Sequence, residues 1–293
     1  MLFDNQTPRY LPHIEAPHIL HMGLSPLDAH HWIETDSDLS RYHGHKLEQR
    51  VRLGDCCYRA LPDSTDAQRE LAERLRIHLT RDQGDLYRGE DDGTLLFRPA
   101  ALRLPAPGAE PLWECSLWLA DDLVIMQEIA GRYHLTAASL CSPSDWLLEE
   151  KFARPLADIH APVPGFDAEL APRVDRFFRH LRPERPVVRH NWSLQPGNEL
   201  CRRPPHDENI GPATQVCYRS ERQSLTRLPQ SGAVVFTIRV YLHPLERLAD
   251  TAGALQALFT AIDRTPAALA AYKGFDRLEP RLAKYRVTCG DDA

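Results

Sequence analysis

Several features that mark other protein classes are missing from this sequence of 293 residues. No apolar run approaches the ~20 residues needed to cross a bilayer. The first residues, MLFDNQTPRY, carry neither the basic flank nor the apolar core of a signal peptide. Lys and Arg (35) are outnumbered by Asp and Glu (41), whereas a nucleic-acid binder normally shows a basic excess. We therefore predict a cytoplasmic protein that binds neither a membrane nor a nucleic acid.

Paired cysteines and the common nucleotide and hydrolase motifs are also absent. The seven cysteines are scattered without a CxxC pair, so a thiolate zinc site is not indicated. We expect free, mostly buried thiols in a reducing compartment. The sequence contains no GxxxxGK[ST], GxGxxG, GxSxG or HExxH motif, which leaves nucleotide-loop, serine-hydrolase and zinc-protease chemistry unsupported.

The pattern of short apolar runs predicts an α+β fold with helices beside an antiparallel sheet. Expected strands cover residues 113–120, 122–130, 132–142, 187–192, 215–227 and 233–243. Expected helices cover 65–79, 142–160, 171–181 and 245–262. We divide the chain into three parts of one compact unit: an N-terminal arm and helix (1–110), a core (111–243) and a C-terminal helical segment (244–293). The first fifty or so residues read as an extended arm.

His160 is the first candidate for a functional side chain. It ends a predicted helix and precedes the rigid segment Pro162-Val163-Pro164-Gly165. A histidine held in this way suits an axial metal ligand, with Nε2 on the metal and Nδ1 donating to a carbonyl or carboxylate. The spacing alone favours a simpler interpretation, in which the ring caps the carbonyl groups of its own helix.

The predicted strand that contains residues 187–192 carries a second candidate group. Alternation places Arg189 and Asn191 on one face of the sheet, and His190 and Trp192 on the other. A buried tryptophan beside a histidine either lines a cofactor pocket or fills the core, and the residue types favour the core.

The segment Arg219–Arg227 is the densest polar run. Alternation along it separates two sets of side chains: Arg219, Glu221, Gln223 and Leu225 on one face, and Ser220, Arg222, Ser224 and Thr226 on the other. On the next strand Arg239 and Tyr241 point the same way. Cross-strand ion pairing on a solvated face explains these residues, and the residues alone favour it. The alternative is a concave sheet whose guanidinium groups bind the carboxylates of a cofactor.

Four motifs follow one another along the second half of the chain. They read Trp146…Glu150-Lys151…Pro155-Leu156…Ile159-His160-x-Pro162-Val163-Pro164-Gly165, Arg189-x-Asn191-Trp192, Arg219-x-Glu221-Arg222-Gln223-x-Leu225-x-Arg227-Leu228-Pro229-x-Ser231-Gly232-Ala233, and Phe236-Thr237-Ile238-Arg239-x-Tyr241. In this order they resemble the haem-dependent oxidative N-demethylase family, over roughly residues 40–260.

The resemblance implies a PAS-type domain, in which an antiparallel sheet with helices at one side holds haem b. Members of the family are linked to the oxidative demethylation of dimethylamine by O2, which gives methylamine and formaldehyde. Their electrons come from NAD(P)H through flavin and iron–sulfur partner subunits. We therefore expect a monooxygenase that acts on a small secondary amine and depends on a reductase subunit.

The resemblance also reverses the interpretation of His160, because haem-binding PAS domains commonly take their iron ligand from a helix between the early and late strands. His160 is therefore the predicted proximal iron ligand, with His190 as the second choice. Trp192 is expected to line the cofactor site, while Arg222 and Arg239 are candidates for binding the haem propionates.

The late strands would then form the distal wall, and their polar side chains are the catalytic candidates. Glu221 would attract a cationic amine, and Arg222 would polarise bound oxygen. Gln223 and Tyr241 would donate hydrogen bonds to that oxygen. A haem-PAS gas or redox sensor without turnover is the alternative function. The sequence shows no kinase, cyclase or coiled-coil segment for a signalling output, which favours the enzyme.

Overall fold

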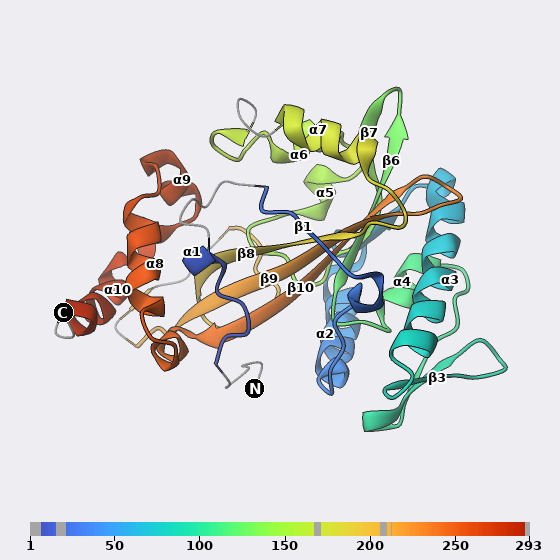
Figure 1. The fold of residues 1–293 in the computed structure, drawn as a ribbon, viewed down its shortest axis with the longest axis horizontal. Coiled ribbons are helices and arrows are strands. Elements are labelled where there is room, and N and C mark those ends of the chain that lie inside the picture. The colour runs from blue at the N-terminus through green and yellow to red at the C-terminus, as the bar shows by residue number, and fades with distance from the viewer. Residues whose placement is uncertain (1–6, 16–21, 167–170, 206–209, 212, 291–293) are drawn as a thin grey trace.

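A computed structural model describes residues 7–15, 22–166, 171–205, 210–211 and 213–290, except for the side chains of 287–290 (Figure 1). The strands are β1 Ser25–Pro26, β2 Tyr58–Ala60, β3 Tyr87–Gly89, β4 Leu95–Phe97, β5 Leu102–Leu104, β6 Asp122–Ile129, β7 Arg132–Ser139, β8 Val187–Pro196, β9 Val216–Arg227 and β10 Val234–Pro244. The α-helices are α1 Pro12–Glu15, α2 Leu39–Leu53, α3 Thr65–Asp82, α4 Pro111–Ser116, α5 Leu148–Lys151, α6 Leu156–His160, α7 Ala171–His180, α8 Ala254–Asp263, α9 Ala267–Tyr272 and α10 Phe275–Gly290.

A seven-stranded antiparallel sheet forms the centre of the molecule, in the order β1-β8-β9-β10-β6-β7-β2. Strands β3, β4 and β5 form a separate small sheet. Together with the helices these sheets confirm the predicted α+β class. The long strands β9 and β10 pair over their full length, with Arg239 opposite Arg222, and Arg222 is opposite His190 on β8.

The β6–β7 hairpin shows how local sequence determines this sheet. Its turn residues Ala130 and Gly131 have φ angles of 51° and 78°. A two-residue turn with two positive φ angles matches the right-handed twist of the strands it joins. The turn lies where the expected strands 122–130 and 132–142 meet, and it includes Ala130, which was expected to end the first strand.

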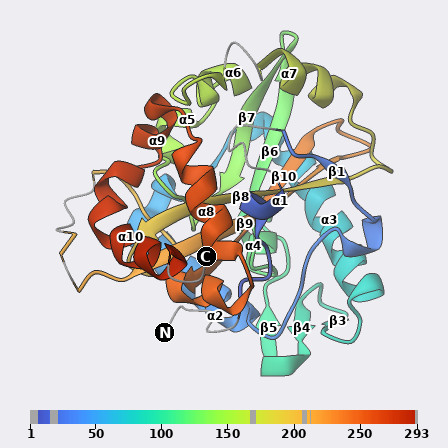
Figure 2. The same cartoon turned by 60° about the vertical axis from the view of Figure 1, so that its left-hand side comes forward.

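Different helices cover the two faces of the sheet (Figures 1 and 2). The face that carries Val124, Met126 and Leu225 packs against the segment containing α5, α6 and α7. The opposite face carries Ile125 and Val235, which share a buried cluster with residues of α3 and α4. Helices α8 and α10 pack on the end of this second face formed by β8 and β9. The segment between β7 and β8 and the turn after α9 both cover the first face, and the site is found beneath them.

Three secondary-structure predictions are wrong. Residues 113–120 were expected as a strand but begin inside α4, where Pro111 occupies the first turn of the helix. A short apolar run has no periodicity that separates a strand from a buried helix. The helix expected over 142–160 is two short helices, α5 and α6, because Pro155 between them restricts the residue before it and has no N–H group. The N-terminal arm is not extended throughout, since it contains α2.

The described cysteines match the prediction of free thiols, four buried and two half-buried; the side chain of Cys289 lies outside the described residues. Within the described ranges, none of the helices combines the length and apolar character needed to span a membrane.

Candidate functional site

A cavity of about 510 Å³ lies between the first face of the sheet and the helices that cover it. This volume falls within the range of small-molecule and cofactor sites. Most of its wall is apolar: Leu24, Val124, Met126, Leu135, Leu156, Ile159, Val163, Phe166, Val174, Phe177, Phe178, Leu225, Phe236 and Ile238. Polar side chains gather where β8 and β9 meet the turn between α9 and α10: Arg189, Asn191, Glu221, Gln223 and Lys273. An apolar chamber with one polar end can hold a large flat ligand and orient a small polar one beside it.

His160 lies in the wall of this cavity, at the last residue of α6. Its Nδ1 is 3.0 Å from the carbonyl oxygen of Leu156 and donates to it, so Nε2 is the nitrogen that keeps a lone pair. The ring stacks on Phe166, with 4.5 Å between the ring centroids. Burial lowers the pKa of His160, the bond to Leu156 opposes this, and the charges of Arg189 and Lys151 lower it further. The imidazole is therefore neutral at neutral pH and suited to coordinating a metal.

Glu221 is the central polar residue of the cavity. Its carboxylate accepts hydrogen bonds from Arg219 Nε (3.0 Å), Asn191 Nδ2 (3.3 Å) and Gln223 Nε2 (2.9 Å). Burial by itself raises the pKa of Glu221, but the charge of Arg219 and the hydrogen bonds more than offset it, so the pKa is below its ordinary value. Gln223 Oε1 is buried and has no hydrogen-bond partner in the described part of the chain. The cavity thus contains an ionised carboxylate and a second acceptor on adjacent positions of one strand face.

Three cationic side chains also line the cavity: Lys151 on α5, Arg189 on β8 and Lys273 after α9. Lys273 is half-buried, and its Nζ donates to the carbonyl oxygen of Trp192 at 3.2 Å. Burial lowers the pKa of Lys273 to about 8, with Glu221 opposing the shift and Arg189 adding to it. These cations offer contacts for anionic groups of a ligand.

The predicted propionate ligands Arg222 and Arg239 lie on the opposite face of the sheet. Arg222 donates to the carbonyl oxygens of Trp32 (3.1 Å) and His31 (2.7 Å), and Arg239 pairs with Asp36. Both arginines are at most 4% exposed. The cavity wall does not include them, because the N-terminal arm covers this face and occupies their guanidinium groups.

Tyr241, His190 and Trp192 lie on the same covered face. Tyr10 stacks on His190 at 4.2 Å and contacts the edge of Tyr241 at 5.7 Å, while Trp192 packs in the cluster with α8 and α10. Burial and the charges of Arg222 and Arg189 lower the pKa of His190 to about 4. Of the predicted site residues, the structure brings His160, Glu221 and Gln223 together at the cavity and leaves the other five behind the sheet.

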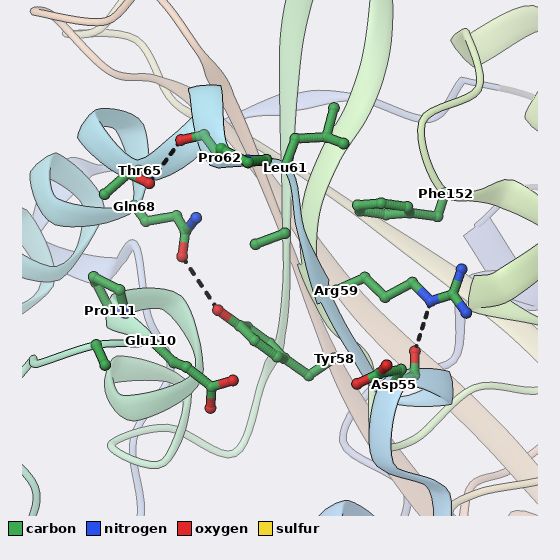
Figure 3. A pocket seen from close by; sticks show the side chains of 12 residues that line it. Asp55, Tyr58, Arg59, Leu61, Pro62, Thr65, Gln68, Glu110, Pro111 and Phe152 are labelled. Carbon is green, nitrogen blue, oxygen red and sulfur yellow. Dashed lines mark hydrogen bonds between the residues drawn. The ribbon is translucent and has the colours of Figure 1, made fainter.

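A second hollow of about 510 Å³ lies between β2, α3 and the start of α4 (Figure 3). Its wall includes Tyr58 and Gln68, whose side chains are 3.4 Å apart, and Arg59, which donates to the carbonyl oxygen of Asp55. None of the predicted site residues contributes to it. The predicted residues His160, Glu221 and Gln223 therefore line the cavity under α5, α6 and α7, and not this second hollow.

A comparison with family models matches residues 23–283 to haem-dependent oxidative N-demethylase, alpha subunit-like proteins. The chain belongs to this family. The resemblance seen in the four sequence motifs is thereby confirmed, and the match extends beyond them at both ends.

The cavity fits the haem that the name of the N-demethylase family implies. His160 offers a neutral imidazole with a lone pair on Nε2, on a wall that is otherwise largely apolar. Lys151 and Arg189 supply cations near the same histidine, suited to propionate carboxylates. A protein controls the properties of a bound haem through the axial ligand, nearby hydrogen bonds and burial.

Sequence reasoning assigned a site role to none of the three cations of the cavity, although Lys151 and Arg189 both stand in the motifs of the family resemblance. Arg189 was part of a quoted motif, and its alternation with His190 placed it on the correct face, but it was assigned no role. Lys273 stands in a helix–turn–helix segment without any local motif, and only the docking of that segment beside β8 brings it to the cavity.

Proposed function

We propose that this chain is the haem-binding subunit of an oxidative N-demethylase that acts on a small secondary amine such as dimethylamine and releases formaldehyde. The observation that carries the proposal is that a neutral His160 and an ionised, half-buried Glu221 both lie in the wall of one largely apolar cavity. Membership of the N-demethylase family supports it.

His160 would hold the haem iron through Nε2, and its bond to Leu156 would fix the ring. Arg189 and Lys151 would bind the propionates in place of the predicted Arg222 and Arg239. When bound, haem b supplies the activation of O2 that oxidises an N-methyl group.

A protonated secondary amine has two N–H donors, and the cavity has two acceptors on one strand face. Glu221 would bind the cation with its carboxylate, and Gln223 Oε1, which lacks a partner among the described residues, would accept the second N–H. Asn191 holds the Glu221 carboxylate in place. The apolar wall excludes water and accommodates the N-methyl groups.

The order of the long strands supports a PAS-type core. Strands β6 to β10 are numbered one to five along the chain. In the sheet they lie in the order β7-β6-β10-β9-β8, which is two-one-five-four-three. The helices α5, α6 and α7 come between the second and the third strand, and His160 ends α6.

The family description refers to an alpha subunit, which supports a multi-subunit enzyme. We infer that electrons reach the haem from NAD(P)H through a flavin and iron–sulfur partner subunit in the cytoplasm, because the sequence contains no nucleotide-binding loop or paired-cysteine motif for these groups.

The absorption spectrum of the purified chain, followed by turnover with dimethylamine, O2 and a reductase, tests the proposal. We expect a Soret band, and formaldehyde formed in step with amine consumption. Absence of a Soret band after reconstitution with haem would exclude a haem subunit. A Soret band without formaldehyde release, when dimethylamine is present and the reductase reduces the haem, would exclude the enzyme. The result would then support the alternative function, a haem sensor without turnover.

A further inference from the structure

The chain has four lysines, and their surroundings differ sharply. Lys46 is fully buried and donates to the carbonyl oxygen of Ser116 at 2.8 Å. Lys284 is on the surface, with its side chain half exposed. Lys151 and Lys273 line the cavity. Burial lowers the pKa of Lys273 to about 8.

Lys273 is held at the polar end of the cavity by backbone contacts. It follows the last residue of α9, and its N–H donates to the carbonyl oxygen of Leu269. Its Nζ donates to the carbonyl oxygen of Trp192 at 3.2 Å, which anchors the side chain against β8. The neutral amine has two N–H groups and one lone pair, so a bond donated to Trp192 leaves the lone pair available to a ligand in the cavity.

The charged groups around Lys273 are Glu221 on β9, Arg189 on β8 and Asp145 before α5. Burial is the largest influence and favours the neutral amine, and Arg189 acts in the same direction. A desolvated lysine beside another cation is the setting in which lysines react with carbonyl groups. Glu221 at the same place is the residue that we propose binds the amine substrate.

We propose that Lys273 is an aldehyde-binding amine, which reversibly captures the small aldehyde formed in the cavity. The inference rests on the proposed function for the source of the aldehyde. The neutral Nζ attacks the carbonyl carbon, the C=O electron pair moves to oxygen, and a proton passes through water from nitrogen to oxygen, giving a carbinolamine. Loss of water breaks the C–O bond and leaves an imine. Hydrolysis reverses both steps, and no atom changes its oxidation state overall.

This reaction would keep a reactive aldehyde on one side chain until water releases it. At neutral pH a lysine with a pKa of about 8 has on the order of 100-fold more neutral amine than an ordinary lysine. The lower basicity makes each neutral amine a weaker nucleophile, so the net advantage in rate is smaller. We expect it to be about tenfold or more.

Reductive trapping of the haem-loaded chain tests the assignment. Added formaldehyde and cyanoborohydride convert an imine to N-methyllysine, and mass spectrometry of peptides gives the rate at each lysine in the same molecule. We expect methylation of Lys273 at least about tenfold faster than that of Lys284. The Lys273→Arg variant should lose this fast labelling, whereas the matched Lys284→Arg variant should keep it. Equal rates at Lys273 and Lys284 would overturn the proposal.

A second arm replaces added formaldehyde by dimethylamine, O2 and a reductase. Labelling of Lys273 under turnover would support both proposals. Labelling from added formaldehyde but none from the amine would overturn the proposed demethylation and still support Lys273 as the aldehyde-binding amine. The two failures are therefore distinguishable.

Discussion

Glu221 and Arg222 are consecutive residues of β9, and their side chains belong to opposite sides of the sheet. The Glu221 carboxylate accepts a hydrogen bond from Asn191 in the cavity wall. The Arg222 guanidinium donates to the carbonyl oxygens of His31 and Trp32 in the N-terminal arm. One peptide bond thus separates a group available to a ligand from a group committed to holding the protein together, and substitutions at the two positions should have different consequences.

Replacing His160 by alanine should remove the haem. We expect the haem content of purified His160→Ala to fall at least about tenfold, because His160 is the one histidine among the described residues of the cavity wall. The haem-to-protein ratio and the position of the Soret band measure this. His190→Ala is the matched control, since His190 stacks on Tyr10 behind the sheet, and it should keep its haem. Unchanged haem content in His160→Ala would refute the assigned ligand.

Replacing Glu221 by glutamine should weaken amine binding. A hydrogen bond to a charged group contributes about 1.5–3 kcal/mol, so KM for dimethylamine should rise by roughly 10–100-fold with haem content unchanged. Steady-state formaldehyde release gives the measurement. Glu150 also lines the cavity but is exposed, and Glu150→Gln should change KM less than about twofold. Equal changes in KM for the two substitutions would show that Glu221 does not bind the amine.

The sequence predicted which side chains of a strand lie on the same face of the sheet, but it did not predict which face binds a ligand. Alternation correctly grouped Glu221 with Gln223 on one strand, and Arg239 with Tyr241 on the next. It did not determine which group faces a ligand, because that depends on what covers each face. The contact between Arg222 and His31 joins residues 191 positions apart. No local pattern encodes such a contact.

The same distinction explains which parts of the fold were predicted. The β6–β7 hairpin, β9, β10 and the end of α6 at His160 follow from turn residues, alternation and proline positions. The docking of Lys273 beside Trp192 depends on how the C-terminal helices pack on the sheet, and sequence reasoning gave no information on it.

Removing Arg222 should destabilise the protein without emptying the haem site. Arg222→Met leaves the carbonyl oxygens of His31 and Trp32 without donors and removes the ion pair with Glu34. Breaking a buried ion pair from one side costs about 3 kcal/mol, which urea denaturation of the haem-free chain should detect. The exposed Arg179→Met should cost less than about 0.5 kcal/mol, although Arg179 also pairs with an aspartate. A cost for Arg222→Met no larger than that of Arg179→Met would contradict the role of the arm contact.

Acid should destabilise the fold partly through His13, which is 2% exposed on α1. Its Nε2 donates to the carbonyl oxygen of Ala254 and its Nδ1 accepts from the Tyr218 hydroxyl, while burial lowers its pKa to about 4. Above pH 6.5 the ring is neutral in the folded and the unfolded chain, so it adds no pH dependence there. As the pH falls from 6.5 towards 4 only the unfolded chain takes up the proton, and stability is lost. By pH 5 this loss is about 2 kcal/mol. Urea denaturation at pH 7 and pH 5 should therefore show a drop in unfolding free energy about 2 kcal/mol larger for the wild type than for His13→Gln. All other histidines are shared by the two proteins, so equal drops would contradict the assignment to His13.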